Sequence, residues 1–288
     1  MRVSIVTTSK GRLHHIRETV PRMLASGADE VVVVDYGCPD GTGDWVERHC
    51  PGARVLRVTD DPGFCLPRAR NLGARAAQGD WIAFVDGDVM VAPGWGDWMR
   101  GHLSAGHFYR AGPIGDRRHP ETWGSAICAR RDFDSVGGYD EVFLGWGGED
   151  TDLYLRLEQS GVIESDYPPH FVTAIPHGDD ERTAWSDLKS REAHLFVNRC
   201  YTAAKQQLTA LLGVKRPPDL DTRARLMAAT KTRIVEWGCD PAKPPPELVY
   251  RVEVEDWLPP PFTMKKQLVF TIRIEQGARR RRDPAHTS

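Results

Sequence analysis

Val31-Val32-Val33-Val34-Asp35 is the stretch that decides the fold. Four β-branched residues in a row, with no polar alternation, are typical of a strand buried on both faces of a parallel sheet. Apolar strands are also expected at residues 2–7, 53–58 and 81–85, with helices between them. This alternation predicts an open, doubly wound α/β sheet with helices on both faces. Such sheets bind their ligands beyond the carboxyl ends of the strands.

The remaining elements follow from periodicity and from proline and glycine. Helices are expected at 13–26, at 41–49, and from Pro67, a favoured first-turn residue, to about Ala77. The second half is less regular, with strands expected at 107–111, 124–130 and 170–175 and helices at 149–160 and 183–204. Proline-rich segments and a strand-like run at 267–274 then follow. We therefore expect a main domain over 1–212 and a C-terminal appendage over 213–288, with a disordered basic tail at Arg279-Arg280-Arg281-Arg282.

Composition narrows the class of protein. The chain has 288 residues, of which 40% are hydrophobic and 27% charged, as is ordinary for a soluble globular protein. A formal net charge of −2 gives no overall basic field, which argues against nucleic acid as a partner. No apolar run is long enough to span a bilayer, and the chain opens on a strand rather than a signal peptide. These features favour a cytoplasmic protein, with membrane contact only at the periphery. The six cysteines form no C-x-x-C pair, which argues against zinc clusters and redox motifs.

Gly147-Gly148-Glu149-Asp150 is the segment that most suggests chemistry. The two glycines allow the backbone to approach a ligand closely. The two carboxylates fall at a predicted helix N-terminus, where the macrodipole stabilises their ionised form. An ionised carboxylate beside the flat apolar wall of Trp146 suits general-base catalysis on a sugar. A helix-capping turn would explain the same residues, so the segment alone leaves both interpretations open.

Two further candidates could bind a metal ion. Asp86-Gly87-Asp88 follows the strand at 81–85, and paired carboxylates suit Mg²⁺ or Mn²⁺. Acidic turns after strands are common, so this pair is weak evidence by itself. His177 follows the strand at 170–175, but a lone histidine is more often structural than a ligand.

Other polar residues at predicted strand ends and helix starts suit a nucleoside diphosphate. Arg70 and Asn71 lie in the first turns of the helix after Pro67, where N–H groups and a guanidinium favour an anion. Asp35 can accept hydrogen bonds from a nucleobase or ribose. A charged helix end and a structural turn are the competing explanations. No P-loop is present, and Gly41-Thr42-Gly43 lacks the third glycine of a dinucleotide loop.

Together these segments resemble the nucleotide-sugar-dependent glycosyltransferases of the GT-A fold. The stretch from Val31 to Thr42, and the stretches Ala69–Gly73 and Gly79–Asp88, are similar to motifs of family 2. Residues 145–150 resemble the W-G-G-E-D motif shared with the β-1,4-galactosyltransferase and polypeptide N-acetylgalactosaminyltransferase families. The likeness covers about residues 1–200. It implies a Rossmann-like, mixed but mainly parallel sheet, with a nucleotide-binding half at about 1–90 and an acceptor half at about 91–212.

The resemblance also implies roles for single residues. Asp88 and His177 would bind the metal, with Mn²⁺ favoured and Mg²⁺ as the alternative. Asp150 would be the catalytic base, and Glu149 would hydrogen-bond a sugar hydroxyl. Thr151 stands where related sequences often carry a third acid, which leaves the acceptor open. The residues expected around the donor are Thr7, Ser9, Arg12, Asp35, Arg70, Asn71, Asp86, Gly87, Trp146, Gly147 and Gly148.

The implied reaction is metal-dependent, inverting transfer of a hexose or N-acetylhexosamine from a nucleotide sugar, with UDP favoured by resemblance only. The acceptor could be a glycan, a lipid-linked sugar, a peptide or a small molecule.

An inactive nucleotide-sugar-binding protein on the same fold is the alternative, which the presence of Asp88, Asp150 and His177 argues against. A nucleotidyltransferase would need a glycine-rich loop after the first strand, and 8–12 is too poor in glycine. A glycoside hydrolase would need two acids flanking a bond, which adjacent Glu149 and Asp150 cannot do.

Overall fold

The computed structural model describes residues 1–214 and 216–276. Contacts divide the chain into two compact units, Met1–Arg191 and the part from Glu192 onward. The sequence placed the boundary at 212, whereas these contacts assign helix α8 (Arg191–Leu212) almost entirely to the second unit. The basic tail at 279–282 lies outside the described residues. None of the helices in the described ranges combines the length and apolarity needed to cross a lipid bilayer.

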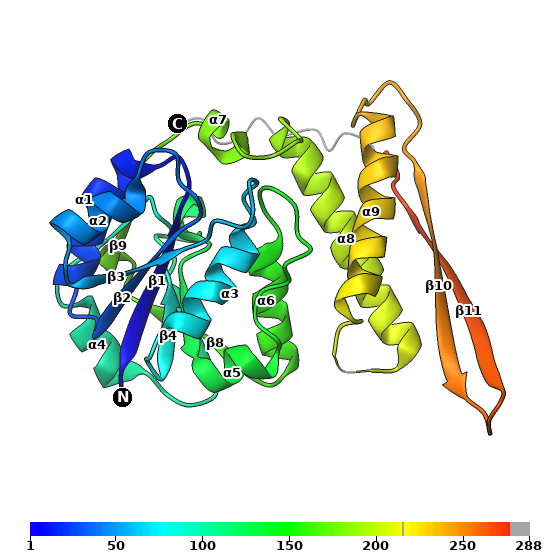
Figure 1. Cartoon of the computed structure of the whole chain (residues 1–288), viewed down its shortest axis with the longest axis horizontal. Helices are drawn as coiled ribbons and strands as arrows, with labels where there is room; N and C mark the ends of the chain where they lie inside the picture. The colour runs from blue at the N-terminus through cyan, green and yellow to red at the C-terminus, as the bar shows by residue number, and fades with distance from the viewer. Residues whose placement is uncertain (215, 277–288) are drawn as a thin grey trace. The chain divides into compact units, whose positions relative to one another are not determined.

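The first unit is built on a seven-stranded sheet with the order β3-β2-β1-β4-β7-β6-β8 (Figure 1). Strand β1 pairs in parallel with both β2 and β4, whereas β7 runs antiparallel to β4 and β6. The expected mixed, mainly parallel sheet is therefore confirmed, and β8 is a strand that the sequence did not suggest. The strands are β1 (Val3–Ser9), β2 (Glu30–Asp35), β3 (Ala53–Arg57), β4 (Trp81–Phe84), β6 (His107–Ala111), β7 (Ala126–Ala129) and β8 (Ile163–Tyr167).

Helices and a small second sheet complete this unit. A two-stranded sheet pairs β5 (Val89–Val91) with β9 (Val172–Ala174), just after the Asp86-Gly87-Asp88 turn. The helix expected at 183–204 begins only at Arg191, because Ser186, Asp187 and Ser190 favour turns over helix interiors. The helices are α1 (Leu13–Ala25), α2 (Thr42–His49), α3 (Leu66–Ala76), α4 (Trp95–His102), α5 (Arg130–Ser135), α6 (Glu149–Gln159) and α7 (Asp179–Thr183), with 3₁₀ turns at Pro120–Thr122 and Pro169–Phe171.

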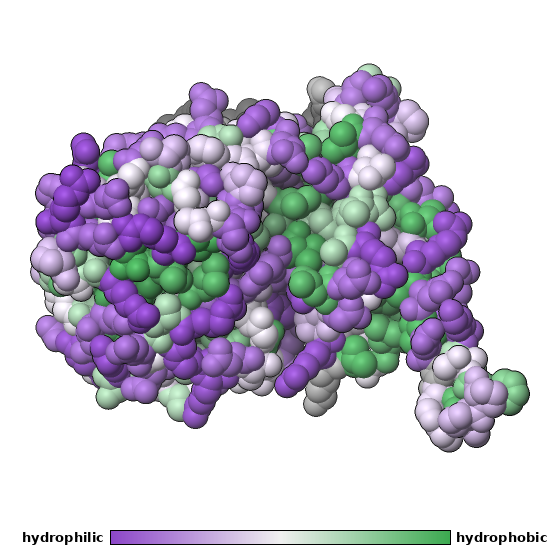
Figure 2. Space-filling model, in the orientation of Figure 1, coloured by the Kyte–Doolittle hydropathy of each residue, from purple (hydrophilic) through white to green (hydrophobic). Residues whose placement is uncertain are grey.

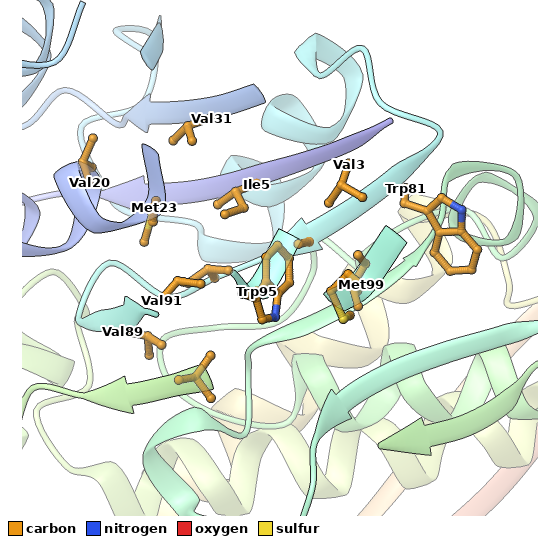
Figure 3. Packing of buried hydrophobic residues seen from close by; sticks show 14 of the residues in the cluster. Val3, Ile5, Val20, Met23, Val31, Trp81, Val89, Val91, Trp95 and Met99 are labelled. Carbon is orange, nitrogen blue, oxygen red and sulfur yellow. The ribbon is translucent and has the colours of Figure 1, made fainter. Parts of the chain in front are cut away.

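The central strands are buried on both faces, as the valine run predicted. Val31 and Val33 face a core that also contains Val3, Ile5 and residues of α1, α2 and α4 (Figure 3). Val32 and Val34 face the opposite core, which is completed by residues of α3, α5 and α6. Because successive side chains of a strand point to opposite faces, only a continuous apolar run can fill both cores.

The second unit contains α8, α9 (Leu220–Trp237) and a hairpin of β10 (Glu247–Trp257) and β11 (Thr263–Arg273). The rings of Phe196 and Trp237 pack edge to face across α8 and α9, with centroids 5.2 Å apart. The hydroxyls of Thr230 and Tyr250 join α9 to the hairpin at 2.8 Å.

The expected strand at 267–274 falls within β11. Helix α9 and strand β10 were not expected from this proline-rich part of the sequence. Pale and green residues mark the exposed apolar tip of the hairpin in Figure 2.

The close approach of α3 to the sheet depends on Gly73. A Cβ at this position would lie 2.3 Å from Cγ1 of Val6 and 2.9 Å from Cγ2 of Val34. We expect Gly73→Ala to lower the free energy of unfolding by about 1–3 kcal/mol, because overpacking forces neighbouring side chains to move. Chemical denaturation followed by circular dichroism measures this loss. Gly101→Ala in α4 is the matched control, since its added Cβ meets no atom within 4 Å. Equal stability of the two variants would contradict the packing argument.

Candidate active site

A buried guanidinium joins two parts of the chain that the sequence singled out separately. Arg70 is 3% exposed and belongs to α3. Its Nη2 donates to Oδ1 of Asp86, beyond the end of β4, at 2.5 Å. Its Nη1 donates to Oδ1 of Asp150, in the first turn of α6, and lies 3.8 Å from Oε1 of Glu149. Arg70 therefore holds the strand-end carboxylate and the helix-start carboxylates in one cluster.

The electrostatics of this cluster give each group a distinct protonation tendency. Burial lowers the pKa of Arg70, but the carboxylates of Asp150, Asp86 and Glu149 outweigh it, so the guanidinium stays charged. Burial raises the pKa of Glu149 to about 8, and the negative charge of Asp150 adds to this effect. Burial also raises the pKa of Asp150, while Arg70 opposes the rise. Glu149 thus tends to keep a proton near neutral pH, and burial raises the pKa of Asp150 in the same direction.

The backbone before α6 requires glycine. Gly147 and Gly148 have φ values of 88° and 102°, in the region that side-chain-bearing residues rarely adopt. Gly148 is the N-cap residue of α6, so Glu149 and Asp150 occupy its first turn. Negative charge is stabilised there by the helix macrodipole. The capping interpretation and the active-site interpretation therefore describe the same turn and do not exclude each other.

Asp88 and His177, the two residues that the resemblance implies as metal ligands, lie in contact. Nε2 of His177 contacts Oδ2 of Asp88, although the two residues are 89 positions apart. Arg12 lies beside them, with Nη1 3.4 Å from the same carboxylate oxygen. The pairing of β5 with β9 explains the arrangement, because it brings the chain before His177 against the chain after Asp88. Carboxylate oxygens and imidazole nitrogens are both common ligands of divalent metal ions in proteins.

Three residues expected at the donor have other roles in this structure. Thr7 and Ser9 are 0% and 1% exposed, so their side chains are enclosed beneath the strand end rather than open to a ligand. Asp35 uses both carboxylate oxygens to accept from the backbone N–H groups of Cys38 and Gly43, at 2.7 and 2.8 Å. These bonds shape the loop after β2, so in this structure Asp35 holds the loop backbone in place.

Asn71 is the largest departure from the expected roles. Its amide donates to the carbonyl of Tyr139 at 2.9 Å and to Oε1 of Glu141 at 2.8 Å, and its Oδ1 accepts from N–H of Tyr139 at 2.8 Å. Asn71 is 4% exposed and thus anchors the segment before the glycines instead of facing a diphosphate. The sequence could not distinguish the two roles, because both place a polar side chain at the start of α3.

Several residues that the sequence did not assign complete the site. The hydroxyl of Tyr139 donates to Oδ1 of Asp150 at 3.3 Å, and the Arg70 guanidinium lies 4.9 Å from its ring centroid. Gly124 has no room for a side chain, because a Cβ would lie 2.7 Å from Oδ2 of Asp86 and 3.0 Å from Oδ2 of Asp150. The position of Tyr139 shortly before the two glycines could have indicated its role from the sequence. Nothing in the sequence around Gly124 indicates that it belongs to the site.

Two aromatic residues lie near the expected donor region. The guanidinium carbon of Arg191 is 3.9 Å from the ring centroid of Trp146, which is therefore packed and only part-exposed. Trp185 donates from Nε1 to the carbonyl of Lys10 at 3.2 Å, and Nζ of Lys10 lies 5.0 Å from a Trp185 ring centroid. The segment after His177 therefore packs over the end of β1.

The raised pKa of Glu149 predicts a pH-dependent stability. Its ordinary value is 4.5, so between about 4.5 and 8 the folded state keeps a proton that the unfolded chain releases. This contribution is complete below pH 4.5 and is lost as the pH rises through 8. Relative to wild type, Glu149→Gln should gain about 4 kcal/mol of unfolding free energy between about pH 5 and 8.5, measured by urea denaturation, because a pKa difference of one corresponds to about 1.4 kcal/mol. The exposed Glu158→Gln on the same helix should follow wild type, and identical profiles for all three proteins would refute the assignment.

Curated relatives are similar over part of their length. Validoxylamine A glucosyltransferase of Streptomyces hygroscopicus subsp. limoneus is 29% identical over 235 residues, covering 60% of this chain and 50% of that protein. Pre-mycofactocin glycosyltransferase of Mycobacterium tuberculosis is 29% identical over 198 residues, covering 57% of this chain and 40% of that protein. The chain thus spans half or less of the length of these relatives.

Solved structures share the fold. Mannosyltransferase PcManGT from Pyrobaculum calidifontis, in complex with GDP-Man and Mn²⁺, has a TM-score of 0.51 at 18% identity, covering 82% of this chain and 74% of that one. Residues 1–349 of S. aureus TarS, in complex with UDP-GlcNAc, have a TM-score of 0.56 at 14% identity, covering 81% and 72%. At these identities the likeness concerns the fold alone.

Two family matches cover most of the first unit. Residues 117–178, which contain the glycine turn, Glu149, Asp150 and His177, match the family described as N-terminal domain of galactosyltransferase. Residues 4–106, which contain the first four strands and Asp86-Gly87-Asp88, match Glycosyl transferase family 2. Residues 4–106 are thus similar to glycosyltransferase family 2, and the first unit has the GT-A fold of these solved glycosyltransferases.

Proposed function

We propose that this protein is a metal-dependent, inverting glycosyltransferase that moves a hexose or N-acetylhexosamine from a nucleotide sugar, with a UDP-sugar favoured, to an acceptor nucleophile. The observation that carries this proposal is the buried Arg70, which joins Asp86 at the end of the nucleotide-binding half to Asp150 in the acceptor half. A structural ion pair would not need the enclosing Gly124, the positive-φ glycines and a second, nearly buried carboxylate at the same place.

Asp88 and His177 are the residues that would hold a divalent cation, with Mn²⁺ favoured and Mg²⁺ as the alternative. Such a cation, when bound, would offset the negative charge of the departing nucleoside diphosphate. Arg12 lies against Asp88 and would add a further positive charge on the diphosphate side. The fit of these side chains to a cation is supported by their contact and by the low exposure of both, 4% for His177 and 10% for Asp88.

Asp150 is proposed as the general base. Its side chain is 13% exposed, against 6% for Glu149, so Asp150 is the more accessible carboxylate of the pair. It would take the proton of the acceptor nucleophile while that nucleophile forms a bond to the anomeric carbon from the face opposite the diphosphate. The bond from carbon to the diphosphate oxygen breaks and its electron pair leaves with the diphosphate. One displacement of this kind inverts the anomeric configuration.

Glu149 and its neighbours are proposed to bind the sugar. Since its pKa is raised to about 8, Glu149 carries a proton near neutral pH and can donate a hydrogen bond to a sugar oxygen. Trp146 offers a flat apolar surface, and Gly147 and Gly148 allow the backbone to come close to the ring. Arg70 and Tyr139 hold the base in position and keep its charge favourable in a low-dielectric site.

A donor panel tests the reaction class. Purified protein is incubated with Mn²⁺ and UDP-glucose, UDP-galactose, UDP-N-acetylglucosamine, UDP-N-acetylgalactosamine or GDP-mannose, and release of nucleoside diphosphate is measured together with donor binding by calorimetry. We expect release from at least one donor, and its loss on adding EDTA. Binding without release would favour the inactive binding protein, and neither binding nor release would overturn the proposal. Release that EDTA does not change would refute the metal requirement.

Replacement of the base separates catalysis from binding. Asp150→Asn keeps the size of the side chain but cannot accept a proton, so we expect the transfer rate to fall by about 10²–10⁴-fold. Donor affinity should change little, because the amide still occupies the same position. Asp134→Asn, on an exposed surface of α5, is the control and should retain the wild-type rate. Near-normal transfer by Asp150→Asn would show that another group acts as the base.

A further inference from the structure

A second cluster of metal-ligating side chains joins α1 to α7. His14 and His15 lie in the first turn of α1, and Glu181 belongs to α7. One ligand atom from each residue lies within 4.8 Å of the other two. The sequence gave no sign of this cluster, because 166 positions separate His15 from Glu181.

The two imidazoles point at opposite oxygens of one carboxylate. Nε2 of His15 is 3.0 Å from Oε2 of Glu181, and Nε2 of His14 is 3.6 Å from Oε1. Ligand atoms around a tetrahedral Zn²⁺ lie roughly 3.4 Å from one another, given bonds of about 2.0–2.1 Å. Small side-chain rotations would therefore bring the three atoms to bonding distance of a single ion.

The chemistry of this set favours zinc. Two imidazoles with one carboxylate form a common protein set for Zn²⁺, with water as a fourth ligand. His15 is 5% exposed, and its Nε2 faces the Glu181 carboxylate. His14 is 59% exposed and leaves the outer side open to water.

We propose that His14, His15 and Glu181 form a Zn²⁺ site beside the Asp88–His177 pair, with the ring centroids of His15 and His177 5.5 Å apart. An ion bound there would hold α7 against the start of α1. The segment that follows α7 and contains Trp185 would be held with it. Trp185 packs over Lys10 at the end of β1, so the ion would hold the segment in place over the strand end. Arg12 approaches Glu181 with Nε 3.9 Å from Oε2, and binding of the ion would displace it from this carboxylate.

The test measures Zn²⁺ binding directly and does not depend on turnover. Metal-free full-length protein is titrated with Zn²⁺ by calorimetry, for wild type, His14→Ala and Glu181→Gln. His170→Ala, an exposed histidine outside the cluster, is the matched control. Asp88→Asn removes a ligand of the other candidate metal site and so shows at which of the two sites Zn²⁺ binds. Hydrogen exchange of residues 178–190, with and without Zn²⁺, shows whether the ion holds this segment against α1.

We expect wild type, His170→Ala and Asp88→Asn to bind Zn²⁺ with similar affinity. His14→Ala and Glu181→Gln should bind on the order of a hundredfold more weakly, since even the loss of an indirect partner of a ligand costs about 10–100-fold. Zn²⁺ should slow exchange in 178–190 in wild type and not in these two variants. Because the Asp88–His177 pair could bind Zn²⁺ as well, the two substitutions are also made in an Asp88→Asn background. Binding that survives them there, or that disappears only in Asp88→Asn, would overturn the proposal. Failure of nucleotide-sugar turnover would leave this result unaffected.

Discussion

The buried guanidinium of Arg70 is the interaction on which the rest of the site depends. Three carboxylates, those of Asp86, Glu149 and Asp150, lie within 4 Å of it. Without a cation between them, their mutual repulsion and loss of hydration would force protons onto several of them. One arginine with two separate donor nitrogens can satisfy two carboxylates at once, which a lysine with its single ammonium could not do in the same geometry. The charge of Arg70 therefore fixes the position of the candidate base and opposes the rise in its pKa that burial causes.

The fold explains how this arginine reaches its partners. Gly73 lets α3 lie close against β1 and β2, where a side chain would collide with Val6 and Val34. Arg70 is one turn earlier on that helix, and Asn71 beside it anchors the segment at Tyr139 and Glu141. The same helix therefore positions the positive charge and the loop that leads to the negative charges. The packing, the loop conformation and the electrostatics of the site therefore all depend on α3.

The sequence predicted much of this fold because its signals are local. The valine run at 31–34 specified a doubly covered strand, and Pro67 marked the start of α3 to within one residue. Residues whose roles depend on distant contacts were harder to interpret. Asn71 and Arg70 are neighbours with similar local signals, yet one holds a loop and the other joins carboxylates, and only the approach of residues 139–150 decides between them. Likewise, the burial of Thr7 depends on Gly87 and the covering chain, which no periodicity in β1 reveals.

The assigned roles of Asp150, Asp88 and His177 in catalysis and metal binding stay predictions. The structure does bring Asp88 to His177, and Asp150 and Asp86 to Arg70.

Glu149 and Asp150 show why adjacent acids can differ in chemistry. Successive residues of a helix point in directions about 100° apart, so the pair cannot share one environment. Glu149 lies deeper, with Arg70 at 3.8 Å, and its pKa is raised to about 8. Asp150 takes the direct bonds from Arg70 and Tyr139, which favour its ionised form against the effect of burial. The two adjacent acids therefore differ in burial and in hydrogen-bond partners, although burial raises the pKa of both. Because the negative charge on Asp150 raises the pKa of Glu149, removing that charge would let Glu149 ionise more readily.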